Sequence, residues 1–225
     1  MKKLGLILFA FVLLIIWLWK DAPAANPQGK LLLSAKGGLC SSLGNGFNSS
    51  ATLDGSYGVG ISAEYFLLEA LSGGLVLVHN SFEGKWQGSN YYSWDNQLGY
   101  TGWDWTNVSI FTKFVMGPQS EASPYFVAGM GLYFPRVTDK IFRSPDTVYT
   151  HTSYGKGEWG YHFGCGVQYL ISQKLLVFLE VPLTFIHTKG LEFHWTDISH
   201  WIGQEHRVYE NSRWVNVLAG ISFVW

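Results

Sequence analysis

The sequence predicts an all-β protein, an eight-stranded antiparallel transmembrane β-barrel with an up-and-down meander. Three observations carry this prediction. Short runs of alternating apolar and polar residues recur through most of the chain. The connections between these runs are alternately short and long. Beyond the first residues no apolar run is long enough for a membrane-spanning helix, although 48% of the residues are hydrophobic.

The N-terminal segment has the layout of a secretory signal peptide. Lys2 and Lys3 precede an apolar run, and Ala22 and Ala24 flank Pro23 in a small-residue cleavage site. We expect residues 1–24 to be a cleaved signal peptide and residues 25–225 to be one outer-membrane β-barrel domain. The alternative is an uncleaved anchor, but the apolar run is shorter than the roughly 20 residues that a spanning helix needs.

Eight alternating runs are the expected strands, at residues 30–41, 56–66, 74–86, 103–116, 124–134, 158–171, 174–187 and 213–225. The expected connections 67–73, 117–123 and 172–173 are short, whereas 42–55, 87–102, 135–157 and 188–212 are long. Short turns on one side and long loops on the other are typical of bacterial outer-membrane barrels. The long connections are therefore expected to lie outside the cell.

In each run every second residue is apolar, and this set is assigned to the face of the strand that contacts lipid. In the first run this set is Leu31, Leu33, Ala35, Gly37 and Leu39, and in the third it is Val76, Val78, Asn80 and Phe82. The opposite parity collects charged residues, and a charge on the lipid face at the midplane costs about 2–4 kcal/mol for Lys or Arg. We therefore expect an ion network in the lumen, formed by Lys36, Glu64, His79, Glu83, Lys113, His162 and Glu180.

That network has two interpretations. An eight-stranded barrel is just wide enough for side chains to fill its interior, which favours a packed polar core. The alternative is a gated pore or a proton path. The two cysteines are expected to remain free thiols, because Cys165 is assigned to the lipid face and Cys40 to the lumen side of a distant strand.

The end of the chain, "NVLAGISFVW", and stretches such as "PYFVAGMGLYF" resemble the small eight-stranded outer-membrane β-barrel family that includes opacity-protein-like barrels. The resemblance implies export to the cell outer membrane of a Gram-negative envelope. It implies contact with outer-membrane lipid, including lipopolysaccharide. It also implies recognition by the barrel assembly machinery through Val217, Ile221, Phe223 and Trp225. The family's members differ in role, so it does not decide the activity.

Aromatic residues gather in two of the long connections. They could bind surface glycans or a host surface, because aromatic rings beside Asn, Asp and Ser suit such contacts. The alternative is that they belong to the upper aromatic girdle. The candidates are Trp86, Tyr91, Tyr92, Trp94, Trp103, Trp195 and Trp201.

Catalysis and metal binding are not expected, and no cofactor is predicted. His187, His194, His200 and His206 are spaced too widely for a compact metal site. Some barrels of this size are lipid A deacylases that use a membrane-facing His with Ser two residues away. Here Lys189 stands two residues after His187, and the pair His151 and Ser153 falls in an expected loop.

The sequence therefore predicts a non-enzymatic outer-membrane protein that serves envelope integrity or surface interaction through its long loops. A narrow, porin-like conduit for small solutes and a lipid A-modifying enzyme are the alternatives. The formal net charge of −1 argues against nucleic acid as a partner.

Overall fold

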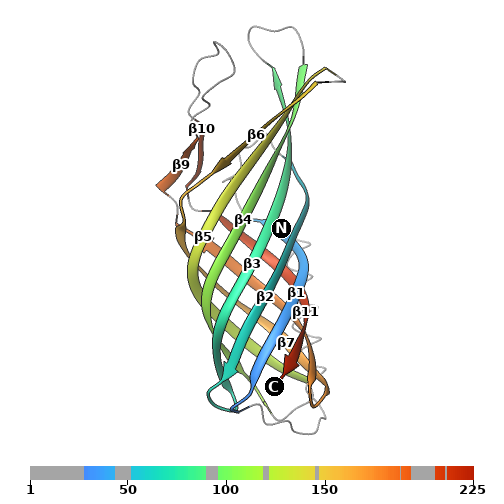
Figure 1. Cartoon of the computed structure of the whole chain (residues 1–225), viewed down its shortest axis with the longest axis vertical. Coiled ribbons are helices and arrows are strands. Elements are labelled where there is room, and N and C mark those ends of the chain that lie inside the picture. The colour runs from blue at the N-terminus through green and yellow to red at the C-terminus, as the bar shows by residue number, and fades with distance from the viewer. Residues whose placement is uncertain are drawn as a thin grey trace.

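The computed structural model describes residues 28–43, 52–89, 96–118, 122–144, 147–187, 189–193, 206–210 and 212–225. The predicted signal peptide lies outside these residues. Eleven strands are assigned: β1 (Leu31–Ser42), β2 (Thr52–Phe66), β3 (Leu71–Ser89), β4 (Asn96–Val115), β5 (Ala122–Ser144), β6 (Thr147–Tyr154), β7 (Glu158–Ser172), β8 (Leu175–Ile186), β9 (Lys189–Phe193), β10 (His206–Glu210) and β11 (Arg213–Val224). Figure 1 shows them as a tall, tilted cylinder.

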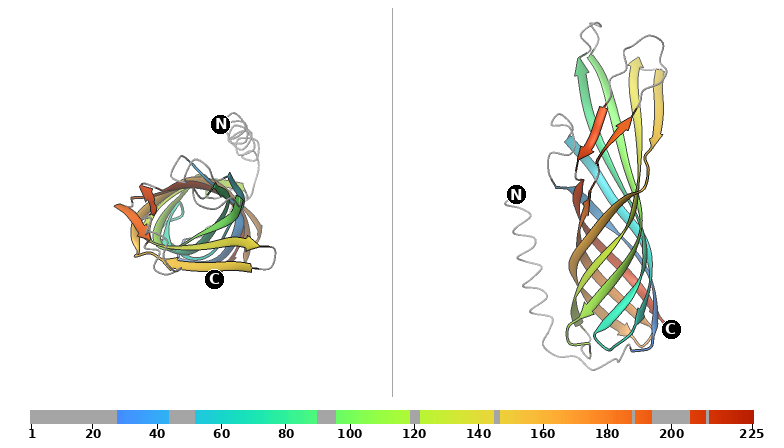
Figure 2. Two further views of the ribbon diagram at one scale, coloured as in Figure 1. Left: turned by 90° about the horizontal axis from the view of Figure 1, so that it is seen from above. Right: turned by 90° about the vertical axis from the view of Figure 1, so that its left-hand side faces the viewer.

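The cylinder is a closed antiparallel barrel of eight strands. Neighbouring strands pair in the circular order β1, β2, β3, β4, β5, β7, β8, β11, and β11 pairs back onto β1. The last residue completes the closure, because Trp225 and Leu31 exchange two backbone hydrogen bonds of 2.9 and 3.2 Å. Figure 2 shows the ring from above. The predicted fold class is confirmed.

The strands extend beyond the barrel at the end opposite Trp225. β3 and β4 stay paired up to Ser89 and Asn96, and the upper part of β5 pairs with β6 instead of β7. The predicted connections 87–102 and 135–157 are therefore largely β-hairpins and not loops. Both hairpins project from the rim in Figure 1. Their residues lie above the apolar belt, where both faces of a strand can be polar, so the alternating pattern that marks the lower strands is lost.

The outer surface of the barrel carries a continuous apolar belt. Large apolar side chains are exposed on seven of the eight barrel strands, for example Leu33, Ile61, Leu75, Ile110, Met130, Phe163 and Ile221, and those of β8 are half-buried or buried. Trp225 at the lower edge is 78% exposed. Within the described residues, no helix is long and apolar enough to cross a membrane. The lipid-facing set predicted for the first run agrees with the structure on β1, where Leu31, Leu33 and Leu39 are exposed.

The third strand has the opposite parity to the one predicted. Leu75 and Leu77 are exposed on the outside, whereas Val76, Val78, Asn80 and Phe82 are buried in the lumen. The prediction was wrong because residues 75–78 are apolar at both parities, so His79, Glu83 and Lys85 decided the assignment. In the structure His79 and Glu83 lie near the upper edge of the belt, where an outward polar side chain costs little.

Pro182 in β8 coincides with an interruption of the ladder that joins β8 to β11. The β8–β11 ladder passes from Leu183 opposite Val215 to Glu180 opposite Leu218 with no paired residues between them. The register is the same on both sides of this gap, so no residue is inserted. Proline has no backbone donor, which accounts for the missing rungs.

Candidate functional site

Two buried ion pairs lie in the lumen of the barrel. Lys36 Nζ lies 2.8 Å from Glu180 Oε1. Lys113 Nζ lies 2.7 Å from Glu64 Oε1 and 2.8 Å from Oε2. All four side chains are at least nine-tenths buried, so each charge depends on its partner for stabilisation.

Tyr125 joins the two pairs into one network. Its hydroxyl donates to Glu180 Oε2 at 3.2 Å, and Lys113 Nζ lies 4.9 Å from the centre of its ring. Ser72 donates to Glu64 at 2.6 Å, and Lys113 donates to Gln168 at 3.2 Å. The network therefore ties together side chains from β1, β2, β3, β4, β5, β7 and β8.

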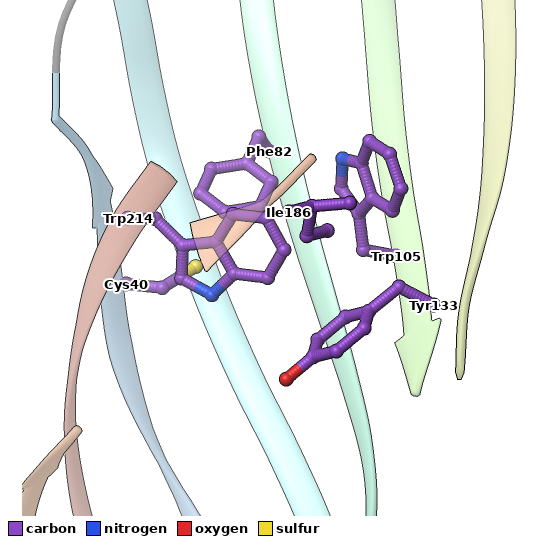
Figure 3. Close-up of a cluster of buried hydrophobic side chains, with 6 residues drawn as sticks. All are labelled: Cys40, Phe82, Trp105, Tyr133, Ile186 and Trp214. Carbon is purple, nitrogen blue, oxygen red and sulfur yellow. The ribbon is translucent and has the colours of Figure 1, made fainter. Parts of the chain in front are cut away.

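Apolar clusters lie above and below this network. The lower cluster contains Leu32, Phe66, Val115, Tyr125, Val127 and Leu176. The upper cluster contains Cys40, Phe82, Trp105, Tyr133, Ile186 and Trp214 (Figure 3). Trp214 is central in the upper cluster, with ring centroids 5.7 Å from Phe82, 5.8 Å from Trp105 and 6.1 Å from Tyr133. These side chains are buried, so the described lumen is packed across its width.

Glycines make room for the large lumen side chains. A Cβ at Gly160 would lie 2.6 Å from the Tyr133 ring, and one at Gly129 would lie 2.6 Å from the His162 ring. Tyr133 Oη and His162 Nδ1 are in turn 3.2 Å apart. Alternating glycine with a large ring lets a narrow barrel close tightly around its contents.

The structure brings together five residues of the predicted ion network and removes two. Lys36, Glu64, Lys113, His162 and Glu180 point into the lumen, and the first three and Glu180 are ion-paired. His79 and Glu83 lie on the outer face of β3 instead, because that strand has the opposite parity. Sequence reasoning missed Tyr125, Gln168 and Ser72, whose polar groups satisfy the charges. An inward parity is the only sequence signal for Tyr125 and Gln168, and Ser72 had none, because it lies in the expected connection 67–73.

The aromatic candidates have different positions. Trp103 was wrongly placed on a binding loop; it faces the lumen opposite Phe82 and packs against the upper cluster. Trp86 lies on β3, and its side chain is outside the described residues. Tyr91, Tyr92, Trp94, Trp195 and Trp201 also lie outside them. On β11, Val217, Ile221 and Phe223 face outward, as does the terminal Trp225.

The two cysteines are free, as predicted. Cys40 is buried in the upper cluster, and Cys165 lies on the outer face of β7. A few buried polar atoms of the upper lumen have no hydrogen-bond partner among the described residues: Asn80 Oδ1, Asn216 Oδ1, Ser212 Oγ and Trp214 Nε1. Such groups commonly bind ordered water.

The eight barrel strands pair in a closed ring, and an apolar belt surrounds it. Spanning β-structure in a bilayer must be closed in this way, and such barrels belong to outer membranes. The chain is an outer-membrane β-barrel. Its outer surface accordingly contacts membrane lipid.

Solved outer-membrane proteins have a similar fold. The neisserial surface protein NspA is 14% identical, with 86% of this chain and 95% of that chain covered, at a TM-score of 0.46. Ail, the attachment invasion locus protein of Yersinia pestis, is 10% identical, with 88% and 99% covered, at 0.45. The outer membrane protease OmpT from Escherichia coli is 9% identical, with 88% and 94% covered, at 0.46.

No protein-family model and no curated protein matches the sequence. The names of the similar structures describe different roles, and at these identities the likeness concerns the fold alone. The role of this barrel therefore has to be argued from its own residues.

Proposed function

We propose that this protein acts in the outer membrane through its outer surfaces, and not by passing solutes through its lumen. The observation that carries the proposal is the filled lumen. Two buried ion pairs linked by Tyr125 occupy its middle, and apolar clusters lie above and below them. A pore would need a continuous wet path, and side chains packed in these layers argue against one.

The paired hairpins above the membrane supply the second half of the proposal. β3, β4, β5 and β6 stay paired past the apolar belt as one four-stranded ladder, in which β4 pairs with β5 up to Leu98 opposite Phe142. A rigid ladder holds its tip away from the membrane at little entropic cost on binding. We infer that these tips make surface contacts, with surface glycans or a host surface as the partner class, while the barrel contributes to envelope integrity.

Hairpin trimming tests this proposal. One variant replaces residues 87–98 and 140–150 with two-residue turns, and the control keeps both lengths but scrambles the tip sequences. We expect the trimmed and scrambled variants to keep the folded gel mobility in cold detergent and the detergent resistance of cells, but to lose adhesion. Full deletion should reduce both adhesion and resistance. If deletion changes neither property, the proposal is wrong.

Conductance tests the exclusion of a pore. The purified full chain in planar bilayers should give no ionic current above that of protein-free bilayers. Discrete channel openings that require the protein would instead favour the narrow conduit that the sequence left open.

A further inference from the structure

The turn that joins β2 to β3 exposes two adjacent leucines at the lower end of the barrel (Figure 1). Leu67 is 59% exposed and Leu68 is 56% exposed. The connection from β7 to β8 instead presents the exposed polar residues Ser172, Gln173 and Lys174. Two neighbouring apolar side chains are unfavourable in water, so the leucine pair indicates an apolar partner at this turn.

The leucine pair is continuous with the apolar belt. Along the outer face of β2, Ile61, Tyr65 and Leu67 are all exposed. Leu31 pairs with Tyr65 from β1, and Trp225 is hydrogen-bonded to Leu31. Both of these side chains are exposed as well. The lipid that covers the belt is therefore the nearest apolar phase to the turn.

The height of the belt on β2 also reaches Leu67. The exposed aromatic residues Tyr57 and Tyr65 mark the two edges of the belt on this strand and are eight residues apart. At about 3.3 Å per residue and a strand tilt of about 40°, eight residues cover about 20 Å of membrane thickness. The apolar band of such barrels is about 25 Å tall. The next two residues, Phe66 and Leu67, add about 5 Å and complete it.

The backbone of the turn does not oppose contact with lipid. The N–H groups of Leu67 and Leu68 both donate to the Leu71 carbonyl at 3.0 Å, and the Leu71 N–H donates to the Leu68 carbonyl at 3.3 Å. The Ala70 carbonyl accepts from the Val115 N–H at 2.8 Å. Backbone groups that enter lipid must be bonded within the protein, because no water is present to replace those bonds. Both leucine N–H groups meet this condition.

We propose that Leu67 and Leu68 insert among the acyl chains of inner-leaflet phospholipids and anchor this side of the barrel in the membrane. Glu69 follows them at the tip of the turn and is half-buried. It lies at the level of the headgroups, where a carboxylate costs little. The polar connection at residues 172–174 stays in water.

The two connections lie on opposite sides of the barrel. In the circular order of eight strands, the β2–β3 connection is four places from the β7–β8 connection. A rim that is apolar on one side and polar on the other sets the barrel obliquely in the bilayer, because interfacial anchors determine tilt. This inference is independent of the proposed surface role, because it concerns the end of the barrel opposite the hairpins.

Spin labels measure the depth of each connection. Leu67→Cys, Leu68→Cys, Ile61→Cys and Gln173→Cys are made one at a time in the full chain with Cys40→Ser and Cys165→Ser. Each labelled chain is reconstituted in phosphatidylethanolamine–phosphatidylglycerol vesicles. Accessibility to oxygen, which concentrates in lipid, is compared with accessibility to a water-soluble nickel chelate. Ile61→Cys is the lipid reference, and Gln173→Cys is the matched reference in the other turn.

We expect the labels at residues 67 and 68 to favour oxygen over the chelate, as the label at residue 61 does, and the label at residue 173 to favour the chelate. Cold-detergent gel mobility confirms that each labelled chain is folded. A chelate preference at residues 67 and 68 equal to that at residue 173 overturns the proposal. Low accessibility to both reagents also overturns it, because protein, such as a second copy of the chain, would then cover the turn in place of lipid.

Unlabelled variants test the anchor without an added apolar group. The pair Leu67→Ser, Leu68→Ser should lower the ratio of folded to unfolded chain in vesicles on the order of 10-fold per leucine, and the control pair Ser172→Ala, Gln173→Ala should leave it unchanged. The loss should shrink in lipids with shorter acyl chains, where the thinner bilayer no longer reaches the turn. A loss that is the same at both thicknesses shows leucines that pack on protein, and no loss shows leucines in water. Either result contradicts the anchor.

Discussion

Lys36 on β1 and Glu180 on β8 form a 2.8 Å ion pair across the lumen, although they are 144 residues apart in the chain. β11 lies between β1 and β8 in the barrel wall. The two side chains therefore meet inside the barrel, although their strands are not hydrogen-bonded to each other. The pair can therefore form only when the barrel has closed, and it reports directly on closure.

Glu180→Gln should destabilise the barrel by about 3–5 kcal/mol, because it leaves the Lys36 ammonium buried without its counter-charge. Lys36→Met should destabilise the barrel by a similar amount, because it leaves the Glu180 carboxylate buried without its counter-charge. The double variant Lys36→Met, Glu180→Gln should lose less stability than the sum of the two single losses. Urea unfolding in lipid vesicles measures all three free energies. Additive losses in the double variant would show that the two side chains do not interact.

Trp214→Ala should loosen the upper cluster, because its ring contacts Phe82, Trp105 and Tyr133. A large-to-small change in a packed core costs about 3–5 kcal/mol for Trp. Trp225→Ala provides the comparison, because that side chain is exposed at the membrane edge. Thermal scans of the gel-mobility transition should show a large shift for Trp214→Ala and a small one for Trp225→Ala. Equal shifts would contradict the packing described for the upper lumen.

Gly160→Ala should destabilise the barrel, because the new Cβ would lie 2.6 Å from the Tyr133 ring and 2.8 Å from the Phe185 carbonyl oxygen. Overpacking of this kind costs about 1–3 kcal/mol. Gly37→Ala is the matched control, since its Cβ would face outward with its nearest atoms at 3.7 Å. Urea unfolding should separate the two variants. A destabilised Gly37→Ala with a neutral Gly160→Ala would reverse the assignment of the faces.

The two thiols should resist a charged maleimide while the barrel is folded. Cys40 is buried in the upper cluster, and Cys165 faces lipid, which a charged reagent does not enter. After unfolding without reductant, two labels should appear by mass spectrometry. An unfolded chain that takes up no label would instead contain a disulfide.

The barrel could be predicted from sequence wherever one parity is polar or rich in glycine. On β1, for example, Leu31, Leu33 and Leu39 alternate with Ser34 and Lys36, and only one orientation keeps the charge out of lipid. The same rule failed on β3, because Leu75, Val76, Leu77 and Val78 are apolar on both faces. Tertiary pairing with β2 and β4 decides that strand, and a single strand's pattern contains no information about it.

The candidate sites could be predicted only where the parity of the strand was clear from the sequence. Charges at inward positions identified the lumen network, but which charges pair depends on the stagger of strands distant in sequence. Trp103, the first residue of the expected strand 103–116, was grouped with the binding candidates because the segment before it is rich in Gly, Asn and aromatic residues. The same error of parity placed His79 and Glu83 in the lumen, whereas the structure places both on the outer face of β3.

The parity of β3 can be measured directly with spin labels placed one at a time in a Cys40→Ser, Cys165→Ser background. Labels at Leu75→Cys and Leu77→Cys should be strongly accessible to dissolved oxygen, which concentrates in lipid, and labels at Val76→Cys and Val78→Cys should be shielded. That alternation would support both the filled lumen and the outward position of His79 and Ser81. High accessibility at residues 76 and 78 with shielding at 75 and 77 would contradict the account of both surfaces.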